Sequence, residues 1–236
     1  MASLGYEKIE GQDHGHWLLI IARPREESYF FAPTLKALQK QGDTVSVLCL
    51  SALSDESLKK SRQQELRDAC RVLGIDADRV RCIDDPSLQE DAEWATEVVA
   101  GHIHEAVNYF RPTGVLTFDK NSGKYTHMHA ACYNGLVHYM NFKKEKERVL
   151  KVKILETIPK WALYDVYYIW TMMATAWCKK SIQHYHTCWA RQARRAASKH
   201  VSQKKWYSCL ASGSRVYMFA NNVRDDTAQF ATGSTG

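Results

Sequence analysis

The fold is decided by one apolar run, Trp17-Leu18-Leu19-Ile20-Ile21-Ala22, near the start of the 236-residue chain. A continuous apolar run of this length is typical of a central parallel strand that is buried on both faces. Charged residues follow it at once, at 23–27, and they predict an exposed loop. Parallel sheets bind ligands at the carboxyl ends of their strands, so this loop is the first place to expect a site.

The same alternation continues along the chain. Further apolar runs predict strands at residues 45–50, 80–83, 114–118 and 152–155. Apolar residues at helical spacing predict helices at 30–38, 57–73, 94–109 and 130–140. Alternating strands and helices imply right-handed crossovers, and therefore an α/β fold with a mainly parallel sheet and helices on both faces. Besides 23–27, the loops at its carboxyl edge are 51–56, 84–93 and 119–129.

The chain is long enough for one domain with a tail. We expect a polar N-terminal segment at 1–16, one α/β domain at 17–157, and a basic, aromatic-rich C-terminal region at 158–236. Within that last region, residues 175–205 suggest one basic helical stretch. Residues 225–236 are small and polar, which predicts a frayed tail.

Charge is unevenly distributed. The formal net charge is +6, but residues 143–205 alone carry 15 Lys/Arg against 4 Asp/Glu. Such a region suits anionic lipid or nucleic acid, and a solvated basic face explains it equally well. The aromatic segment 161–178 suggests peripheral membrane contact through 161–205, although a buried core helix is an alternative. Neither a signal peptide nor a clear transmembrane helix is apparent.

Seven cysteines are scattered through the sequence without CxxC spacing. This argues against a disulfide framework and against a zinc site made of thiolates. A reducing compartment is the natural inference.

Three segments together resemble one family: Ile20 to Leu35, Arg62 to Ile75, and Leu116 to Asp119 followed by His129. Their residues and order are similar to those of the N-acetylglucosaminylphosphatidylinositol de-N-acetylases (PIG-L/LmbE-like proteins). The resemblance implies a Rossmann-like fold and a zinc ion that helps to remove acetate from an N-acetylglucosamine group. It also implies a glycolipid or sugar-phosphate substrate, a role in glycosylphosphatidylinositol (GPI) anchor biosynthesis, and a location in the cytoplasm or at the cytosolic face of the endoplasmic reticulum.

The family's site residues are replaced at several positions. Its motif Ala-His-Pro-Asp-Asp-Glu carries a zinc His, a general-base Asp and a zinc Asp, and those positions are Arg23, Arg25 and Glu26 here. Its later motif Gly-His-x-Asn-His places an oxyanion-stabilising His at Thr126 and the last zinc ligand at His129. The resemblance therefore leaves Glu26 and His129 as metal ligands and no assigned catalytic residue.

These replacements have chemical consequences. Arginine stays protonated, so Arg23 cannot ligate zinc and Arg25 cannot accept a proton from water. His127 is a candidate substitute ligand, but it lies two residues from His129, and that spacing separates two rings on a regular helix. Arg23 and Arg25 beside a strand end suggest an anion site, and with Arg62 and Asp119 they form the candidate substrate- or anion-binding set. His102 and His104, spaced i,i+2 on a helix, are interpreted as surface residues.

Three functions are compatible with these residues. The first is a zinc-dependent de-N-acetylase with impaired catalysis, and the second is a non-catalytic pseudoenzyme that binds an anionic sugar phosphate or phosphoinositide headgroup. Nucleic-acid binding is the least favoured, because no recognition motif accompanies its basic and aromatic residues. Those residues are Arg191, Arg194, Arg195, Lys199, Lys204 and Lys205, with Trp189 and Trp206.

Overall fold

A computed structural model describes residues 14–52, 56–89, 91–124, 126–142, 150–158, 182–186, 190–203 and 216–232. Its centre is one seven-stranded sheet in the order β3-β2-β1-β4-β5-β7-β6. The strands are β1 (His16–Ile21), β2 (Thr44–Cys49), β3 (Val80–Cys82), β4 (Gly114–Phe118), β5 (Lys151–Leu155), β6 (Ile182–His186) and β7 (Ala220–Asp225). The first five are parallel, and β7 and β6 add antiparallel pairs at one edge.

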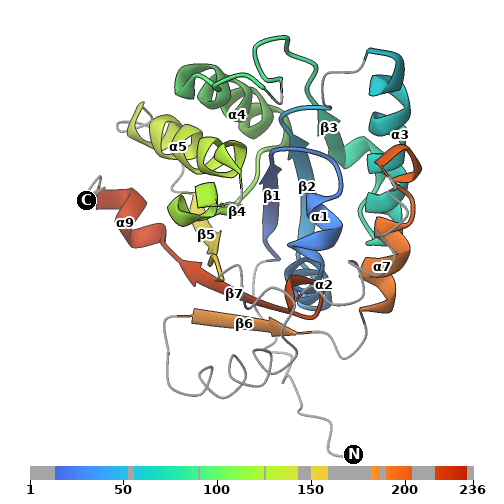
Figure 1. Cartoon of the computed structure of the whole chain (residues 1–236). Coiled ribbons are helices and arrows are strands. Elements are labelled where there is room, and N and C mark those ends of the chain that lie inside the picture. The colour runs from blue at the N-terminus through green and yellow to red at the C-terminus, as the bar shows by residue number, and fades with distance from the viewer. Residues whose placement is uncertain are drawn as a thin grey trace, which may run out of the picture.

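Helices cover both faces of the sheet, as the sequence predicts (Figure 1). One face carries α4 (Thr96–Phe110) and α5 (His127–Phe142), and the other carries α2 (Ala32–Lys40), α3 (Glu56–Val72) and α7 (Arg191–Ala197). The short helix α1 (Glu26–Tyr29) follows β1, and α9 (Thr227–Thr232) follows β7. The 3-10 turns are η1 (Ala77–Arg79), η2 (Lys120–Lys124), η4 (Val201–Gln203) and η5 (Val216–Met218). The predicted α/β fold is therefore confirmed.

The strand at residues 16–21 forms the centre of the core. Residues 18–22 have no exposed surface, which agrees with a strand flanked by β2 and β4 and covered on both faces. The charged loop follows directly after the carboxyl end of this strand. The fold thus places residues 22–29 at the edge of the sheet where ligands bind in parallel α/β folds.

The C-terminal part differs from the expectation. One helix over 175–205 is wrong, because β6 and α7 divide that stretch. The frayed tail from residue 225 is also wrong in part, because α9 spans Thr227–Thr232. The sheet continues past residue 157, since β7 hydrogen-bonds to β5. Sequence reasoning missed these antiparallel strands because their pattern is short and polar, as expected at a sheet edge. Segment 161–178 lies outside the described residues.

No helix among the described residues is long and apolar enough to span a bilayer.

Gly135 sets how closely α5 approaches α4. A Cβ atom at this position would lie 2.8 Å from the Cβ of Val99, closer than real carbon contacts allow. We expect Gly135→Ala to lower the free energy of unfolding by about 1–3 kcal/mol, the usual effect of overpacking, as measured by urea denaturation. Adding Val99→Ala should recover part of the loss, and an unchanged Gly135→Ala midpoint would contradict this packing.

Candidate functional site

The candidate site lies where β1 ends and α1 begins. Arg25 caps α1 in the left-handed backbone region, with φ of 88°. This conformation is uncommon for a residue with a side chain and is held only where neighbouring contacts over-determine it. It turns the chain sharply, so that Glu26 and Glu27 both enter the protein interior, with 3% and 0% of their surface exposed.

Glu26 is saturated with hydrogen-bond donors. Its Oε2 accepts bonds from the backbone N–H groups of Ala22 (2.9 Å) and Arg23 (3.2 Å). Its Oε1 accepts one from Arg23 Nε at 3.1 Å and lies 2.8 Å from His129 Nε2. Burial alone would raise the pKa of Glu26, but His129 and Arg23 outweigh burial and hold that pKa below its usual value. Glu26 is therefore a carboxylate, and the facing His129 nitrogen donates to it.

His129 is fixed by aromatic rings. It lies in the first turn of α5 with 1% of its surface exposed. Its imidazole stacks on Phe118 of β4 with ring centroids 3.8 Å apart, and the edge of Phe30 packs against it. Its Nδ1 is buried without a hydrogen-bond partner. Glu26 and His129, which the resemblance assigns as two metal ligands, thus contact each other directly across 103 residues of sequence.

A zinc ion does not fit this arrangement. Zinc sites in proteins need three or four ligand atoms with free lone pairs. Within the described part of the chain, no three His, Cys, Asp or Glu side chains gather to hold a metal. The position of the family's first zinc ligand is Arg23, whose guanidinium contacts the same Glu26 oxygen as His129. A cationic donor therefore stands where a ligand would be needed.

Arg25 contacts the C-terminal part of the chain. One of its terminal nitrogens donates to the Gln203 carbonyl at 2.9 Å, and the other donates to the Tyr29 hydroxyl. The guanidinium lies 4.7 Å from the centre of the Tyr29 ring, a cation–π distance. Its Nε is buried and has no hydrogen-bond partner. Arg25, which stands at the general-base position of the family motif, thus has one N–H donor without a partner.

A second buried pair involves the next residue of the loop, Glu27. His200 Nε2 lies 2.8 Å from Glu27 Oε1, which also accepts a bond from the Ser28 hydroxyl. Neither side chain of the pair is exposed. Sequence reasoning missed His200, because the two residues are 173 positions apart and no motif marks it. The pair connects the site loop to the segment after α7.

The remaining predicted residues are less closely associated. His127 is exposed, so the structure does not bring it to Glu26. The Thr126 hydroxyl accepts a bond from the Met128 N–H and thereby caps α5. Asp119 is occupied by Thr157, which donates to it from both its backbone N–H and its hydroxyl. Arg62 donates to the Ala52 carbonyl at 3.4 Å, and its Nε is buried without a partner.

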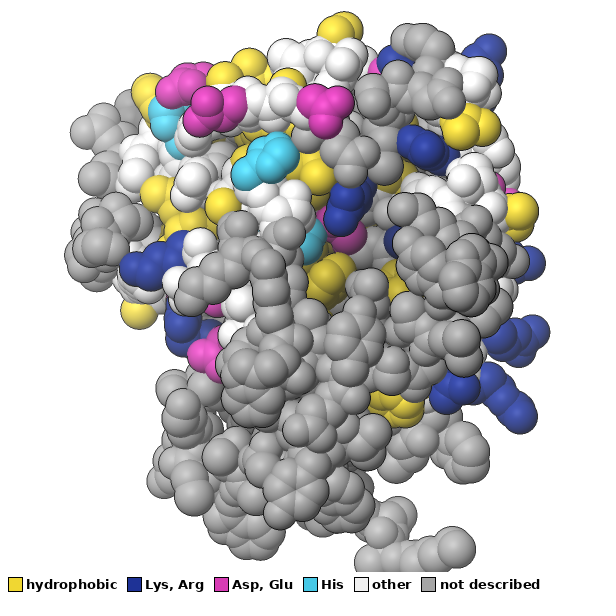
Figure 2. Space-filling model, in the orientation of Figure 1, with side chains coloured by type: hydrophobic (Ala, Val, Ile, Leu, Met, Phe, Trp, Pro, Cys, Tyr) yellow, Lys and Arg dark blue, Asp and Glu magenta, His cyan; other side chains and the backbone are white. Residues whose placement is uncertain are grey.

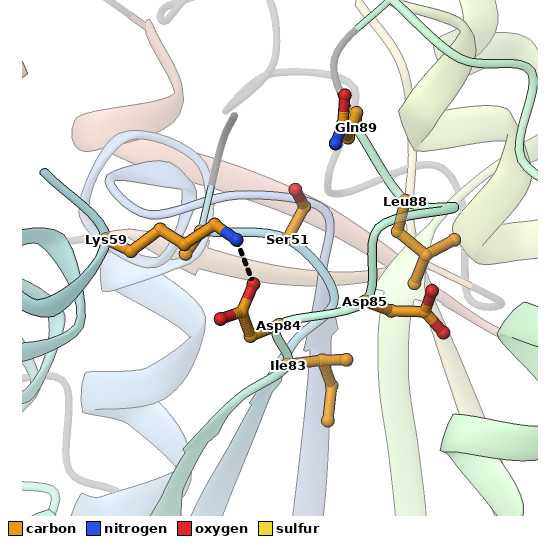
Figure 3. A pocket seen from close by; sticks show the side chains of 8 residues that line it. Ser51, Lys59, Ile83, Asp84, Asp85, Leu88 and Gln89 are labelled. Carbon is orange, nitrogen blue, oxygen red and sulfur yellow. Dashed lines mark ion pairs between the residues drawn. The ribbon is translucent and has the colours of Figure 1, made fainter. Parts of the chain in front are cut away.

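A polar pocket lies beside the loop, at the carboxyl ends of β2 and β3. It is lined by Ser51, Ala52, Lys59, Ile83, Asp84, Asp85, Leu88 and Gln89. Figure 3 shows Lys59 and Asp84 facing each other across it, with Lys59 Nζ 2.5 Å from Asp84 Oδ1. The other aspartate, Asp85, bonds His102 of α4 at 2.8 Å. His102 is therefore a partly buried hydrogen-bonding residue, which corrects its interpretation as a surface histidine.

The Asp85–His102 pair gives a pH prediction. The hydrogen bond from His102, with two more from Ser87, lowers the pKa of Asp85 to about 2. Because the folded pKa lies below the unfolded value, the pair stabilises the protein above about pH 4, and this contribution is lost as pH falls toward 2. Both side chains are partly exposed, so we expect no more than about 1 kcal/mol. Carboxyl NMR titration should show this pKa rising in His102→Ala, and an unchanged pKa would contradict the contact.

Solved structures share the fold of this chain. N,N'-diacetylchitobiose deacetylase from Pyrococcus horikoshii superimposes with a TM-score of 0.60 over 92% of this chain and 86% of that chain, at 14% identity. That level of identity shows the fold alone. The seven-stranded sheet with helices on both faces is therefore an α/β fold that this chain shares with that deacetylase.

The sequence comparisons identify the family. The family described as GlcNAc-PI de-N-acetylase matches residues 18–140, and the chain belongs to it. A probable N-acetylglucosaminyl-phosphatidylinositol de-N-acetylase of Schizosaccharomyces pombe is 35% identical over 170 residues, covering 70% of this chain and 65% of that protein. The corresponding Bos taurus de-N-acetylase is 27% identical over 226 residues, covering 87% and 81%. The chain thus spans 65% of the length of the yeast relative.

Proposed function

We propose that this chain recognises the N-acetylglucosaminyl-phosphatidylinositol headgroup, in GPI-anchor biosynthesis at the cytosolic face of the endoplasmic reticulum, with strongly impaired hydrolysis. The substrate and pathway are suggested by relatives that are named de-N-acetylases of this glycolipid. The impairment is suggested by one observation: Arg23 Nε and His129 Nε2 both contact Glu26 Oε1, at 3.1 and 2.8 Å.

Amide hydrolysis needs a water molecule made nucleophilic, either by a metal or by a general base. Glu26 has no oxygen left without a donor, and His129 uses the nitrogen that faces it as a donor. The family's base position holds Arg25, which cannot take a proton. Glu26, His129 and Arg25 therefore supply neither route in the arrangement that the described residues adopt.

Recognition of the headgroup has better support. The pocket of Figure 3 is lined by the polar side chains of Ser51, Gln89 and the paired Lys59 and Asp84, which are chemically suited to bond sugar hydroxyl groups. Arg25, in the loop after β1, has an Nε donor without a hydrogen-bond partner, and a guanidinium suits a phosphate oxygen. Binding and hydrolysis can thus separate in this chain, because the residues for each are different.

The experiment measures zinc content, headgroup binding and deacetylation of the purified chain, with the Schizosaccharomyces pombe relative as a parallel control. We expect zinc well below one per chain, measurable headgroup binding, and turnover reduced about a thousandfold, the size of a lost general base. Glu26→Ala and His129→Ala should leave the zinc content unchanged. Stoichiometric zinc that disappears in both variants, together with turnover like that of the relative, would overturn the proposal.

A second candidate is a pseudoenzyme that binds an anionic sugar phosphate or phosphoinositide without any turnover. The buried, unpartnered Arg25 Nε favours it. Titration calorimetry should then show inositol phosphate binding at least tenfold more tightly than neutral inositol, with the difference lost in Arg25→Gln. Equal affinities for both ligands would contradict this candidate.

A further inference from the structure

Helix α7 presents a basic face to solvent. Its arginines Arg191, Arg194 and Arg195 are exposed, and so is Lys199 just beyond its end. The opposite face consists of Ala193, Ala196 and Ala197, all buried, and the helix packs against α3. Lys and Arg side chains gather along the edge of the molecule where α7 and α3 lie (Figures 1 and 2). We call Arg191, Arg194, Arg195 and Lys199 the α7 basic face.

The charge of this face is not neutralised by its described neighbours. None of its four cations forms an ion pair with a described acidic side chain. The nearby acidic residues of α3 are already used: Asp68 pairs with Arg71, and Glu65 accepts two bonds from Ser202. Four like charges on nine residues repel one another, and a multivalent anionic partner relieves that repulsion.

The segment after α7 connects this face to the candidate site. His200 bonds Glu27, and the Gln203 carbonyl accepts the bond from Arg25. Ser202 is held by Glu65 of α3 through two bonds of 2.7 Å. Several hydrogen bonds therefore hold the segment that follows the α7 basic face against the loop of the candidate site. A surface that docks on α7 lies beside the site loop.

We propose that the α7 basic face docks on an anionic phospholipid membrane surface. Contact is electrostatic, because the apolar side of this seven-residue helix is small and already buried in the protein. A lipid surface is favoured over nucleic acid because no described side chain of α7 is aromatic, and single-stranded nucleic acid is usually held by base stacking. The inference rests on the proposed function, since a glycolipid headgroup stays at the membrane surface.

Vesicle co-sedimentation tests the proposal. The full chain should bind vesicles of phosphatidylcholine mixed with phosphatidylserine and not vesicles of phosphatidylcholine alone, and binding should weaken as salt rises. Arg191→Glu/Arg195→Glu should lower the affinity at least tenfold, since each basic residue near an anionic bilayer contributes substantially. The matched control, Arg111→Glu/Lys151→Glu, changes the charge equally at two exposed positions, at the end of α4 and the start of β5, and should bind normally. Thermal melts confirm that both variants are folded.

Each other outcome overturns the proposal. These outcomes are equal binding to neutral vesicles, equal losses in the two double variants, and tighter binding of single-stranded RNA than of the anionic vesicles at the same salt. Calorimetry with a soluble headgroup separates this proposal from the proposed function. Vesicle binding without headgroup binding would support the membrane-docking proposal and contradict the proposed function. Headgroup binding without vesicle binding would support the proposed function and contradict the membrane-docking proposal.

Discussion

Arg23→His is expected to give a protein that binds one zinc ion per chain. The substitution removes the guanidinium from Glu26 Oε1 and supplies an imidazole at the same position in the loop. With Glu26 and His129 it completes two histidines and one carboxylate, a ligand set used by catalytic zinc sites. We expect zinc affinity to rise by about a hundredfold or more, equivalent to roughly 3 kcal/mol, as measured by competition with a chromogenic chelator.

The control for this gain is Arg191→His, which adds a histidine on the exposed face of α7, away from Glu26. It should leave zinc binding unchanged. Adding Glu26→Ala to Arg23→His should abolish the gain. If the unsubstituted chain already binds zinc as tightly as Arg23→His, the guanidinium is not what excludes the metal. Adding Arg25→Asp to the zinc-binding variant then tests whether a carboxylate at the base position restores turnover.

His200→Ala is expected to be the most destabilising single substitution considered for this chain. Among the described residues, it leaves the fully buried Glu27 carboxyl group with the Ser28 hydroxyl as its remaining side-chain hydrogen-bond partner. Breaking a buried pair by removing one member typically costs about 3–5 kcal/mol. For a chain of this length we therefore expect the melting temperature to fall by about 10 °C, measured by calorimetry.

A double-mutant cycle identifies the source of that loss. Glu27→Gln and His200→Gln each remove one charge-capable group, and together they leave two neutral amides that can bond each other. The double variant should be more stable than the sum of the two single losses predicts. A loss below about 1 kcal/mol in His200→Ala would contradict the buried pair, because a surface-like contact is worth no more than that.

Sequence pattern predicted the parallel part of the fold well. The five parallel strands fall within one or two residues of the apolar runs, because a strand buried on both faces needs unbroken apolar sequence. The antiparallel edge was missed for the opposite reason. Strand β7 contains Asn221 and Asn222, and the buried Asn221 bonds Thr34 of α2 across 187 residues. Such a residue interrupts the apolar pattern, although its polar atoms are satisfied in the folded chain.

The candidate site was predictable only where a motif marks it. Glu26 and His129 stand at motif positions, and the structure places them in contact. The partners of Arg25 and Glu27 carry no local signal, because a backbone carbonyl at residue 203 and a single histidine at residue 200 have no characteristic spacing. Contacts of this kind depend on how the C-terminal segment folds back, which a single sequence does not reveal.

The long separation between Glu27 and His200 also affects how the protein is made. Residues 22–29 leave the ribosome well before the histidine that pairs with Glu27, 173 residues later. At about 5–20 residues per second this interval lasts roughly ten to thirty seconds. During that time the nascent chain can form β1 and β2, but its loop carboxylate still lacks the imidazole. The Glu27 carboxyl group therefore gains its imidazole partner only after residue 200 has been made, and a chain interrupted before that residue lacks the pair.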